Sequence, residues 1–203
     1  MKLYFSPGAC SLSPHIALRE AGLPFELVRV DLRAKKTVDG ADYLAINPKG
    51  YVPALELDDG QLLTEGAIVV QYIADQNPDS RLAPRQGTIE RLRLAEWLHF
   101  IATELQKASG PIKHPKASDE LKEALKAKLE LRLSFLAQSL ERKPFLLGES
   151  FSVADGYAFY ALRSLLKIDA GLLQRHPVLN GYFERLAARP AVRAALEAEG
   201  LTS

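Results

Sequence analysis

The chain has 203 residues, 47% of them hydrophobic, and a formal net charge of +1. Its length suits one large domain or two small ones, and its near-neutral charge argues against nucleic acid or an acidic membrane surface as the main partner. A single cysteine and four scattered histidines exclude internal disulfides and predict a protein without a metal site. No apolar run is long enough for a signal peptide or a membrane span, so we expect a soluble, cytoplasmic protein.

One stretch near the start, residues 7–14, joins a predicted strand at residues 1–6 to a helix. Ser11 or Ser13 can cap that helix, and Cys10, the only cysteine, precedes it. A helix N-terminus offers unpaired amide donors and favours negative charge, so it stabilises a thiolate. Lowering a cysteine pKa from ~8.5 to ~7 requires about 2 kcal/mol, and a helix end supplies about 0.3 to 2 kcal/mol. Position alone could therefore leave Cys10 partly ionised at neutral pH.

Two interpretations of Cys10 stay open on position alone. It is either such a reactive thiol or a small buried hydrophobe that is inert to redox chemistry. The segment from Cys10 to Ser13 has the spacing of a C-x-x-C redox pair, with serine in place of the second thiol. A redox partner would therefore come from another molecule, most simply a small soluble thiol.

The first part of the chain alternates strand and helix patterns. A second strand at residues 25–32 follows the first helix, and the two strands should be parallel. Residues 54–57 and 61–64 flank an Asp-Asp-Gly turn, which predicts a hairpin, and residues 65–76 predict a helix. This order matches a thioredoxin-like domain over residues 1–77.

The remainder of the chain is helical. Residues 78–86 are rich in proline and charge, as in a linker, and residues 87–203 contain no strand candidate. The fold class is thus α/β plus all-α. A leucine stripe with Lys and Glu on the outer faces predicts a second long helix, and we assign the whole stripe to the core: Leu121, Leu125, Leu129, Leu133, Leu136 and Leu140. The predicted helices cover residues 87–108, 121–140, 152–165, 177–188 and 190–199. The segment from Ser152 to Asp155 (S-x-x-D) resembles a capping box and predicts the start of the third, and a proline opens each of the last two.

The first of these helices has two distinct sides. Its apolar stripe predicts the core-facing side, and at 100° per residue three polar residues fall on nearly the opposite side: His99, Thr103 and Gln106. This polar side is either a solvated face or the wall of a site.

Six short segments carry a family resemblance. They are residues 6–11 (SPGACS), 47–55 (NPKGYVPAL), 63–68 (LTEGAI), 97–99 (WLH) with 103–106 (TELQ), 151–155 (FSVAD) and 184–190 (ERLAARP). Together they resemble the bacterial beta class of the cytosolic glutathione transferases, over essentially the whole chain. The resemblance implies a first domain that binds glutathione as co-substrate, a helical domain that forms the electrophile pocket, a homodimer, and no metal.

The resemblance also implies roles for individual residues. Glutathione carries two carboxylates, one ammonium and a peptide-like middle. A cis bond between Val52 and Pro53 would present the Val52 backbone to the cysteinyl segment. Glu65 would pair with the γ-glutamyl ammonium, the Gly66 amide would hold its carboxylate, and Lys35 would hold the glycyl carboxylate. The implied glutathione contacts are Ala9, Cys10, Lys35, Val52, Pro53, Glu65, Gly66, His99, Thr103 and Gln106, with Cys10 and Gln106 catalytic.

The chain departs from the family pattern near the thiol. The family typically offers asparagine and histidine where this chain has His99 and Gln106. Gln106 can donate a hydrogen bond to sulfur but cannot take its proton at neutral pH. Ser164 stands where the resemblance implies an aromatic residue, which suggests a roomier electrophile pocket.

The predicted function is conjugation of glutathione to small hydrophobic electrophiles, with Cys10 beside the glutathione thiol. One alternative is a glutathione-dependent thiol-disulfide reductase, dehalogenase or peroxidase that uses Cys10 covalently. The other is a non-enzymatic regulator that binds proteins on the same fold.

Overall fold

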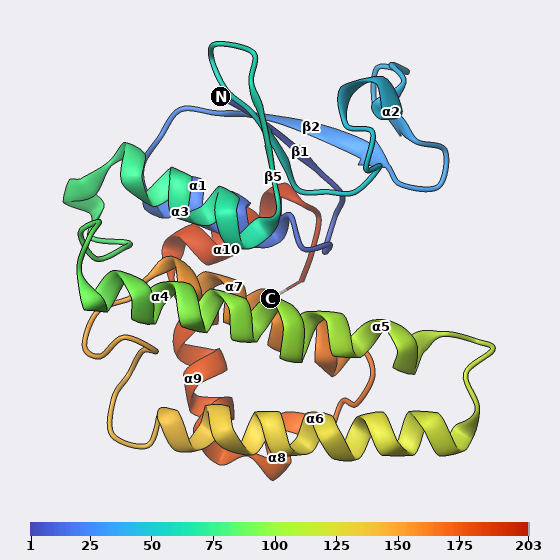
Figure 1. The fold of residues 1–203 in the computed structure, drawn as a ribbon, viewed down its shortest axis with the longest axis vertical. Helices are drawn as coiled ribbons and strands as arrows, with labels where there is room; N and C mark the ends of the chain where they lie inside the picture. Colours follow the sequence, from blue (N-terminus) through green and yellow to red (C-terminus); the bar gives the residue numbers. More distant parts are fainter. Residues whose placement is uncertain (203) are drawn as a thin grey trace. The chain divides into compact units, whose positions relative to one another are not determined.

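The computed structural model describes residues 1–202, apart from the side chain of Lys113. Contacts divide the chain into two compact units. The first contains Met1–Ala83 together with the segment from Arg189 onward, and the second contains Pro84–Ala188. Figure 1 shows the chain coloured along its sequence and labels the α-helices and three of the strands, β1, β2 and β5. Within the described residues, no helix is long and apolar enough to cross a membrane.

A five-stranded mixed sheet forms the centre of the first unit, in the order β3-β2-β1-β4-β5. β1 and β2 are parallel, which confirms the predicted βαβ unit, and the other neighbours are antiparallel, including the predicted hairpin of β4 and β5. The strands are β1 Lys2–Phe5, β2 Glu26–Asp31, β3 Lys36–Thr37, β4 Ala54–Glu56 and β5 Leu62–Thr64.

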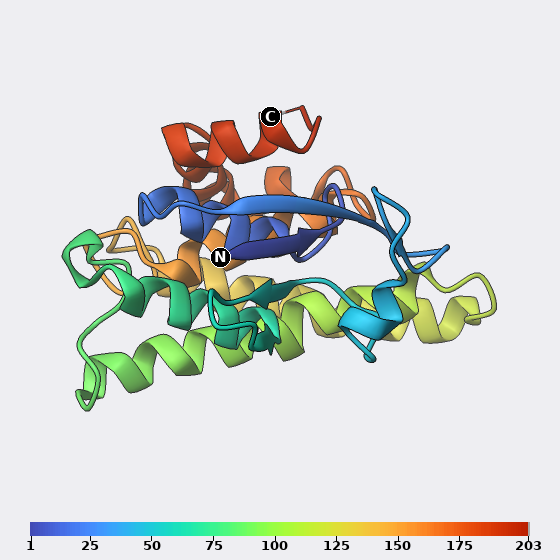
Figure 2. The same ribbon diagram turned by 90° about the horizontal axis from the view of Figure 1, so that it is seen from above.

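Helices cover this sheet within the same unit. They are α1 Leu12–Glu20, α2 Tyr43–Ile46, α3 Gly66–Gln76, the 3-10 turn η1 Pro78–Ser80 and α10 Pro190–Ala198. α1 contacts both α3 and α10, and Figure 2 shows the same unit from above. The helices at α1 and α3 agree with the prediction, whereas β3 and α2 lie in a segment that was predicted to be a loop.

Alternate residues of β1 serve the two faces of the sheet, as the period of a strand requires. Leu3 and Phe5 are buried, and the Phe5 ring centroid lies 6.3 Å from that of His15 on α1. On the opposite face, Tyr4 belongs to a buried cluster with Tyr43 of α2, and their ring centroids are 5.7 Å apart. The sheet therefore has a packed layer on each side.

The last helix corrects the predicted domain boundary. The sequence analysis placed residues 87–203 in one helical domain, but α10 has its contacts in the first unit, against α1. The buried residues of α10 include Leu196, and Arg189 just before the helix pairs with Glu20 of α1 at 2.6 Å. Periodicity predicted the helix correctly, but it carries no information about which neighbour the apolar side meets.

A buried polar chain reinforces this contact. Glu199, at the end of α10, accepts a hydrogen bond from the backbone N–H of Gly8 at 2.8 Å and lies 2.9 Å from Nδ1 of His15. Arg19 donates a hydrogen bond to Nε2 of His15 at 2.9 Å, so Nε2 is an acceptor and the ring N–H is at Nδ1. This N–H donates a hydrogen bond to the Glu199 carboxylate. The end of α10 is thereby bonded to the loop that carries Cys10.

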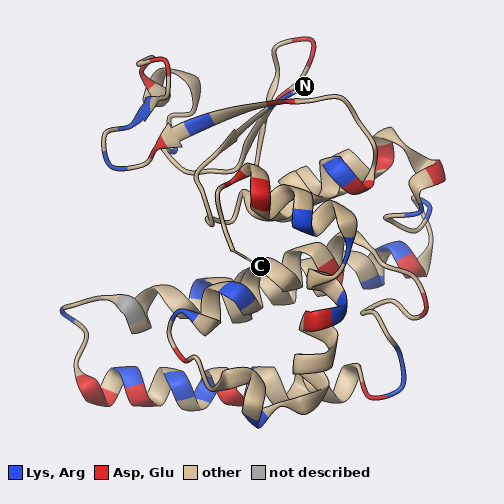
Figure 3. Ribbon diagram, turned by 180° about the vertical axis from the view of Figure 1, so that it is seen from behind, with Lys and Arg blue, Asp and Glu red and all other residues tan. Residues whose placement is uncertain are grey.

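The second unit is helical, as predicted. Its elements are α4 Ile89–Phe100, the π-helical segment η2 Ile101–Gln106, α5 Lys107–Lys113, α6 Asp119–Ser139, α7 Val153–Leu166, α8 Leu172–Arg175 and α9 Pro177–Ala187. α7 is the most deeply buried helix of this unit, and its N-terminus has the predicted capping box of Ser152 and Asp155. Acidic and basic residues are interspersed along α6 (Figure 3).

Two details of the helical prediction differ from the structure. The apolar stripe of α4 is buried as predicted, but its helix continues as η2, a π-helix that no sequence pattern indicated. On α6 the leucine stripe is buried at Leu129, Leu133 and Leu136, whereas Leu121 is 48% exposed. The leucine repeat therefore continues into the first turns of α6, where Leu121 is not covered by neighbouring residues.

Candidate glutathione site

Cys10 lies in the turn before α1 and is half-buried. Its Sγ donates a hydrogen bond to the backbone carbonyl of Val52 at 2.9 Å. A thiol can make this bond and a thiolate cannot, since the carbonyl oxygen would repel its charge, so the contact favours the protonated sulfur. The sulfur is therefore placed against the backbone of another loop and is not a fully buried hydrophobic group.

The helix end beside Cys10 differs from the expectation of unpaired donors. The Leu12 N–H donates to the Ala9 carbonyl at 3.0 Å, and the Ser13 N–H donates to the Cys10 carbonyl at 3.3 Å. Ser11 occupies the N-cap position, but its side chain makes no capping bond and contacts the backbone of residue 6 instead. Ser13 is buried and its hydroxyl has no partner among the residues that the structure describes, so neither serine caps α1 as predicted.

The Val52–Pro53 bond is cis, as the resemblance implied. Val52 and Pro53 are buried, and the Val52 N–H makes no hydrogen bond with any residue that the structure describes. The Tyr51 carbonyl just before it accepts hydrogen bonds from the Tyr43 hydroxyl and the Asn47 amide, each at 2.8 Å. Burial raises the pKa of Tyr43, which keeps its hydroxyl protonated as a donor.

Lys35 is bonded to the same loop. Its ammonium donates to the carbonyl of Gly50 at 2.8 Å. Gly50 has a φ of 64°, and a Cβ there would come within 3.0 Å of Leu44 and 3.4 Å of the Lys35 ammonium. Only glycine fits this approach without strain. The residue that the resemblance assigns to the glycyl carboxylate therefore lies at the loop that precedes Val52.

Glu65 and Gly66 open α3. Glu65 has a φ of 66°, and its carbonyl accepts from two amides of the first turn. The N–H of Gly66, as the first residue of the helix, has no intrahelical acceptor. The Glu65 carboxylate pairs with the ammonium of Lys49 at 3.1 Å, and Lys49 also donates to the Thr64 hydroxyl at 2.9 Å.

Sequence reasoning missed Lys49. It lies within the Asn-Pro-Lys-Gly segment that carried the family resemblance, so its position was noted but no role was assigned to it. Charge alone does not separate it from the other lysines of the first unit. The signal is spatial, because the loop before the cis bond brings its ammonium to the start of α3.

The remaining three predicted residues lie in the second unit. His99 and Thr103 are exposed; Nδ1 of His99 is 2.8 Å from the Ala95 carbonyl, and the Thr103 hydroxyl donates to the His99 carbonyl at 2.9 Å. Gln106, at the end of η2, accepts a short hydrogen bond from the Tyr157 hydroxyl through its Oε1. The amide NH₂ of Gln106 is therefore the half of the group left to donate. Tyr157 was not predicted as a site residue.

The structure thus brings together the predicted contacts of the first unit, around Cys10, the cis bond and the start of α3. His99, Thr103 and Gln106 form a separate group on α4 and η2 of the second unit. Within the described residues, no group of three or more His, Cys, Asp or Glu side chains could hold a metal ion.

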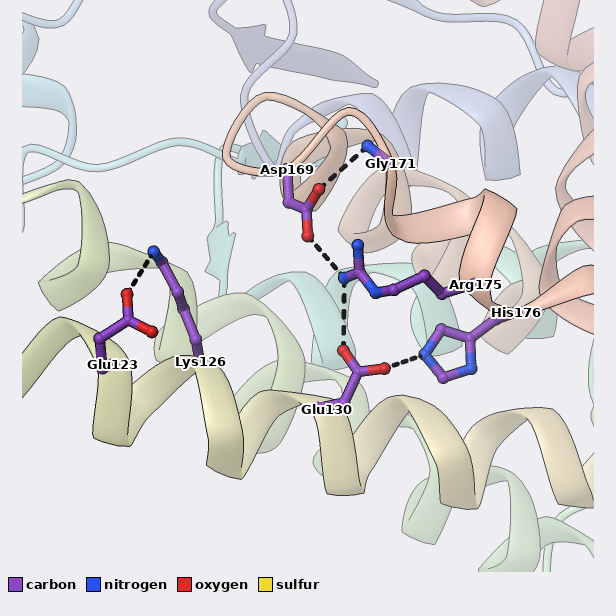
Figure 4. Close-up of polar contacts among 7 residues, drawn as sticks. All are labelled: Glu123, Lys126, Glu130, Asp169, Gly171, Arg175 and His176. Carbon is purple, nitrogen blue, oxygen red and sulfur yellow. Dashed lines mark hydrogen bonds and ion pairs between the residues drawn. The ribbon is translucent and has the colours of Figure 1, made fainter.

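A separate polar cluster of the helical unit contains none of the predicted site residues (Figure 4). Glu130 of α6 lies 2.6 Å from Nε2 of His176 and 3.4 Å from a nitrogen of Arg175, which also pairs with Asp169 at 2.5 Å. The bond from Arg175 is the main reason that the pKa of Asp169 lies below its usual range. These charges border a mainly apolar pocket of about 140 Å³. Because its charges are paired with one another, we interpret the cluster as a structural contact that holds α6 against the segment around α8.

Two family profiles match the chain. They are the glutathione S-transferase N-terminal domain over residues 8–76 and the glutathione S-transferase C-terminal domain over residues 100–190. Glutathione S-transferase GstA of Escherichia coli O157:H7 is 45% identical over 201 residues, which cover 99% of this chain and 100% of the relative. The chain therefore belongs to the glutathione transferase family.

Solved structures refine the class. One is a sphingomonad glutathione S-transferase complexed with glutathione, and another is a bacterial beta class glutathione S-transferase of Sphingomonas chungbukensis. Each is 48% identical, has a TM-score of 0.92 and covers 100% of both chains. The predicted fold, a thioredoxin-like domain followed by helices, and the beta-class resemblance are confirmed. The protein is a glutathione transferase.

Proposed function

We propose that the protein conjugates glutathione to small hydrophobic electrophiles, with Cys10 beside the glutathione thiol. The observation that carries this proposal is the Val52 loop, which has a cis bond to Pro53 and whose carbonyl oxygen lies 2.9 Å from the Cys10 sulfur. A backbone edge beside a sulfur suits a cysteinyl peptide, because the amide groups of the peptide can pair with it as a strand would. The sphingomonad relative solved with glutathione supports this ligand.

Binding would exchange donors on the Val52 carbonyl. The cysteinyl N–H of glutathione would replace the Cys10 thiol as donor, and the Val52 N–H would donate to the cysteinyl carbonyl. The net change is small, since one hydrogen bond replaces another. The Cys10 thiol would then donate to the glutathione sulfur instead.

The two ends of glutathione would meet the remaining residues of the first unit. Lys35 would turn from the Gly50 carbonyl to the glycyl carboxylate, which is a stronger, charge-assisted acceptor. Glu65 would take the γ-glutamyl ammonium, and the Gly66 N–H would donate to the carboxylate at the positive end of α3. Two opposite termini would thereby fix the sulfur between them.

In the reaction, the glutathione thiol releases its proton to solvent. The sulfur then forms a bond with an electrophilic carbon, and the leaving group departs with the electron pair of the broken bond. Cys10 and the amide NH₂ of Gln106 would stabilise the sulfur anion as donors, and neither takes the proton. His99 and Thr103, on the same side of that helical stretch, complete the proposed glutathione contacts.

We also propose the division of labour between the domains, with glutathione held by residues 1–77 and the electrophile pocket formed by the helical residues 87–188. A cytoplasmic homodimer completes the proposal. Large apolar side chains that are exposed on each unit support dimerisation, among them Tyr51 and Ile68 on the first and Leu92 on the second. Sedimentation velocity at micromolar concentration tests the dimer, which should sediment at twice the chain mass.

One experiment separates conjugation from covalent thiol chemistry. Wild type and Cys10→Ala are each incubated with oxidised glutathione for intact-mass analysis and assayed for conjugation of a chloronitroarene. A conjugating enzyme keeps much of its rate after the substitution, although wild type alone gains one glutathionyl adduct. If Cys10→Ala instead abolishes every glutathione-dependent activity, the covalent reductase is the correct assignment. A protein that is not retained on immobilised glutathione would be a regulator.

A further inference from the structure

We propose that Lys49 binds the α-carboxylate of the γ-glutamyl end of glutathione, beside Glu65, which takes the ammonium. This inference rests on the proposed function and adds a residue to its binding site. Its basis is the ion pair between the Lys49 ammonium and Oε1 of Glu65 at 3.1 Å, with a second bond from Lys49 to the Thr64 hydroxyl at 2.9 Å.

The pair joins two separately held segments. Lys49 lies in the turn after Asn47, where its backbone N–H donates to the Asn47 side chain at 3.2 Å. Thr64 ends β5, and Glu65 precedes α3 with a φ of 66°. The start of a helix and the loop before the cis bond thus bring one cation and one anion to the same point of the first unit.

A stabilising role does not explain this pair. The Lys49 side chain is 53% exposed and the Glu65 side chain is 69% exposed. Ion pairs this open to water contribute little to the free energy of folding, because solvent screens them and two long side chains lose freedom. Both charges also remain accessible to a ligand that can offer each of them a partner.

The γ-glutamyl end of glutathione is such a ligand. It carries an ammonium and a carboxylate on one carbon atom. The ammonium can therefore pair with the Glu65 carboxylate while the carboxylate pairs with the Lys49 ammonium. A carboxylate accepts about four hydrogen bonds, and Gly66 offers only its N–H, since it has no side chain. Lys49 supplies the additional donor with a full charge. Lys35 cannot serve here in the same complex, because the proposed function assigns its ammonium to the glycyl carboxylate at the other end of glutathione.

The exchange balances in charge and in protons. One protein ion pair and one solvated zwitterion become two ion pairs between protein and ligand, and no proton moves. Removal of the Lys49 charge should therefore affect glutathione only through its α-carboxylate. A ligand without that group provides the direct test.

The experiment is a calorimetric titration of wild type, Lys49→Met and Lys36→Met with two ligands. The ligands are reduced glutathione and 4-aminobutyryl-cysteinylglycine, which keeps the amino group and lacks the α-carboxylate. Lys36 is the matched control, because it is an exposed lysine of the same unit whose side chain makes no hydrogen bond or ion pair with the part of the chain that the structure describes. We expect Lys49→Met to weaken glutathione binding about 5- to 10-fold and to change binding of the analogue less than about 2-fold. Lys36→Met should leave both affinities unchanged.

A second variant protects this interpretation from folding effects. Lys49→Arg keeps the charge and should retain glutathione affinity to within about 3-fold. An equal loss for both ligands, unchanged affinity in Lys49→Met, or tighter binding in that variant would each overturn the role of Lys49 while the proposed function stands. If wild type itself gives no heat with glutathione, the proposed function fails together with this inference.

Discussion

Cys10 and Lys35 show how the site residues are held one by one. The first donates to the carbonyl of Val52 and the second to the carbonyl of Gly50, so both are tied to the loop at the cis bond. Each bond fixes a side chain in the place where glutathione would need it. A ligand that offers a better acceptor or donor replaces a bond that already exists, so little side-chain freedom is lost on binding.

Tyr4 and Glu56 provide a pH-dependent prediction at the same scale. The Tyr4 hydroxyl donates to Glu56 at 2.6 Å, and this bond is the main reason that the pKa of Glu56 lies below its ordinary value of 4.5. A carboxyl with a depressed folded-state pKa stabilises the fold above its unfolded pKa and loses that contribution as the pH falls through the folded value. Tyr4→Phe should therefore lower the free energy of unfolding by about 1 kcal/mol at pH 7, and the difference should shrink between pH 5 and 3.

Urea unfolding at several pH values measures this effect. Tyr72→Phe serves as the control, because the Tyr72 hydroxyl makes no hydrogen bond with any described residue. This substitution should change stability equally little at every pH. A Tyr4→Phe deficit that stays constant from pH 7 to pH 3 would mean that Glu56 is not the partner that matters.

The sequence predicted which residues belong to the candidate site, but it did not predict the hydrogen bonds that these residues make in the structure. Motifs located Cys10, Val52 and Glu65, and the family resemblance implied Lys35; the structure brings all four into the first unit. Lys49 was missed because its importance depends on a contact across 16 positions of the chain, and no local pattern records such a contact.

At the scale of elements, the capping box of α7 was predicted correctly, but the further hydrogen bonds of its aspartate were not. The S-x-x-D pattern predicted its start, and the Ser152 N–H and hydroxyl both donate to Asp155 at 2.8 Å. Asp155 is completely buried and also accepts from the Leu146 N–H and the Tyr182 hydroxyl. Burial raises the pKa of this carboxyl, and these donors oppose the rise. One side chain thus joins α7 to the loop before it and to α9.

Asp155→Asn should consequently destabilise the protein far more than the loss of an ordinary cap. The amide NH₂ of asparagine cannot accept, so buried donors would lose their partner, and we expect a loss of about 2 to 4 kcal/mol in the free energy of unfolding. Chemical denaturation followed by circular dichroism measures it. Asp119→Asn, in the exposed first turn of α6, should change stability by less than about 0.5 kcal/mol. Similar effects of the two substitutions would contradict the role given to Asp155.

Element prediction succeeded where a period was long enough to be recognised. The βαβ unit, the hairpin and the long helices follow from two or more turns or repeats of pattern. The two-residue strand β3 and the four-residue helices α2 and α8 are too short for any period, and η2 changes the turn of a helix without changing its composition. These short elements are set by tertiary contacts.

At the scale of the whole chain, periodicity does not predict which helices pack against one another. Helix α10 was predicted from its proline and apolar repeat, yet it completes the unit that starts at residue 1. Glu199 is the polar centre of this contact, since it accepts from both His15 and Gly8 while completely buried. Which neighbour a helix meets depends on residues far away along the chain.

Glu199→Gln tests this contact. The amide would place an N–H₂ group against either the His15 or the Gly8 donor, and we expect a loss of about 2 to 3 kcal/mol in the free energy of unfolding. Thermal unfolding should show a clear decrease in Tm for this variant. Glu197→Gln, which changes an exposed glutamate on the same helix, should show almost no decrease. Equal Tm values for both variants would show that α10 is held by its apolar residues alone.

The discontinuous first unit also governs the order of synthesis. The strands of the sheet leave the ribosome early, but the helix that covers α1 is made only after the intervening Pro84–Ala188. Until then the side of α1 that contacts α10 has no cover, and the loop of Cys10 lacks its hydrogen bond to Glu199. The domain that is translated first is therefore the last to be completed, and a nascent chain that stops before residue 190 would expose this surface to chaperones and proteases.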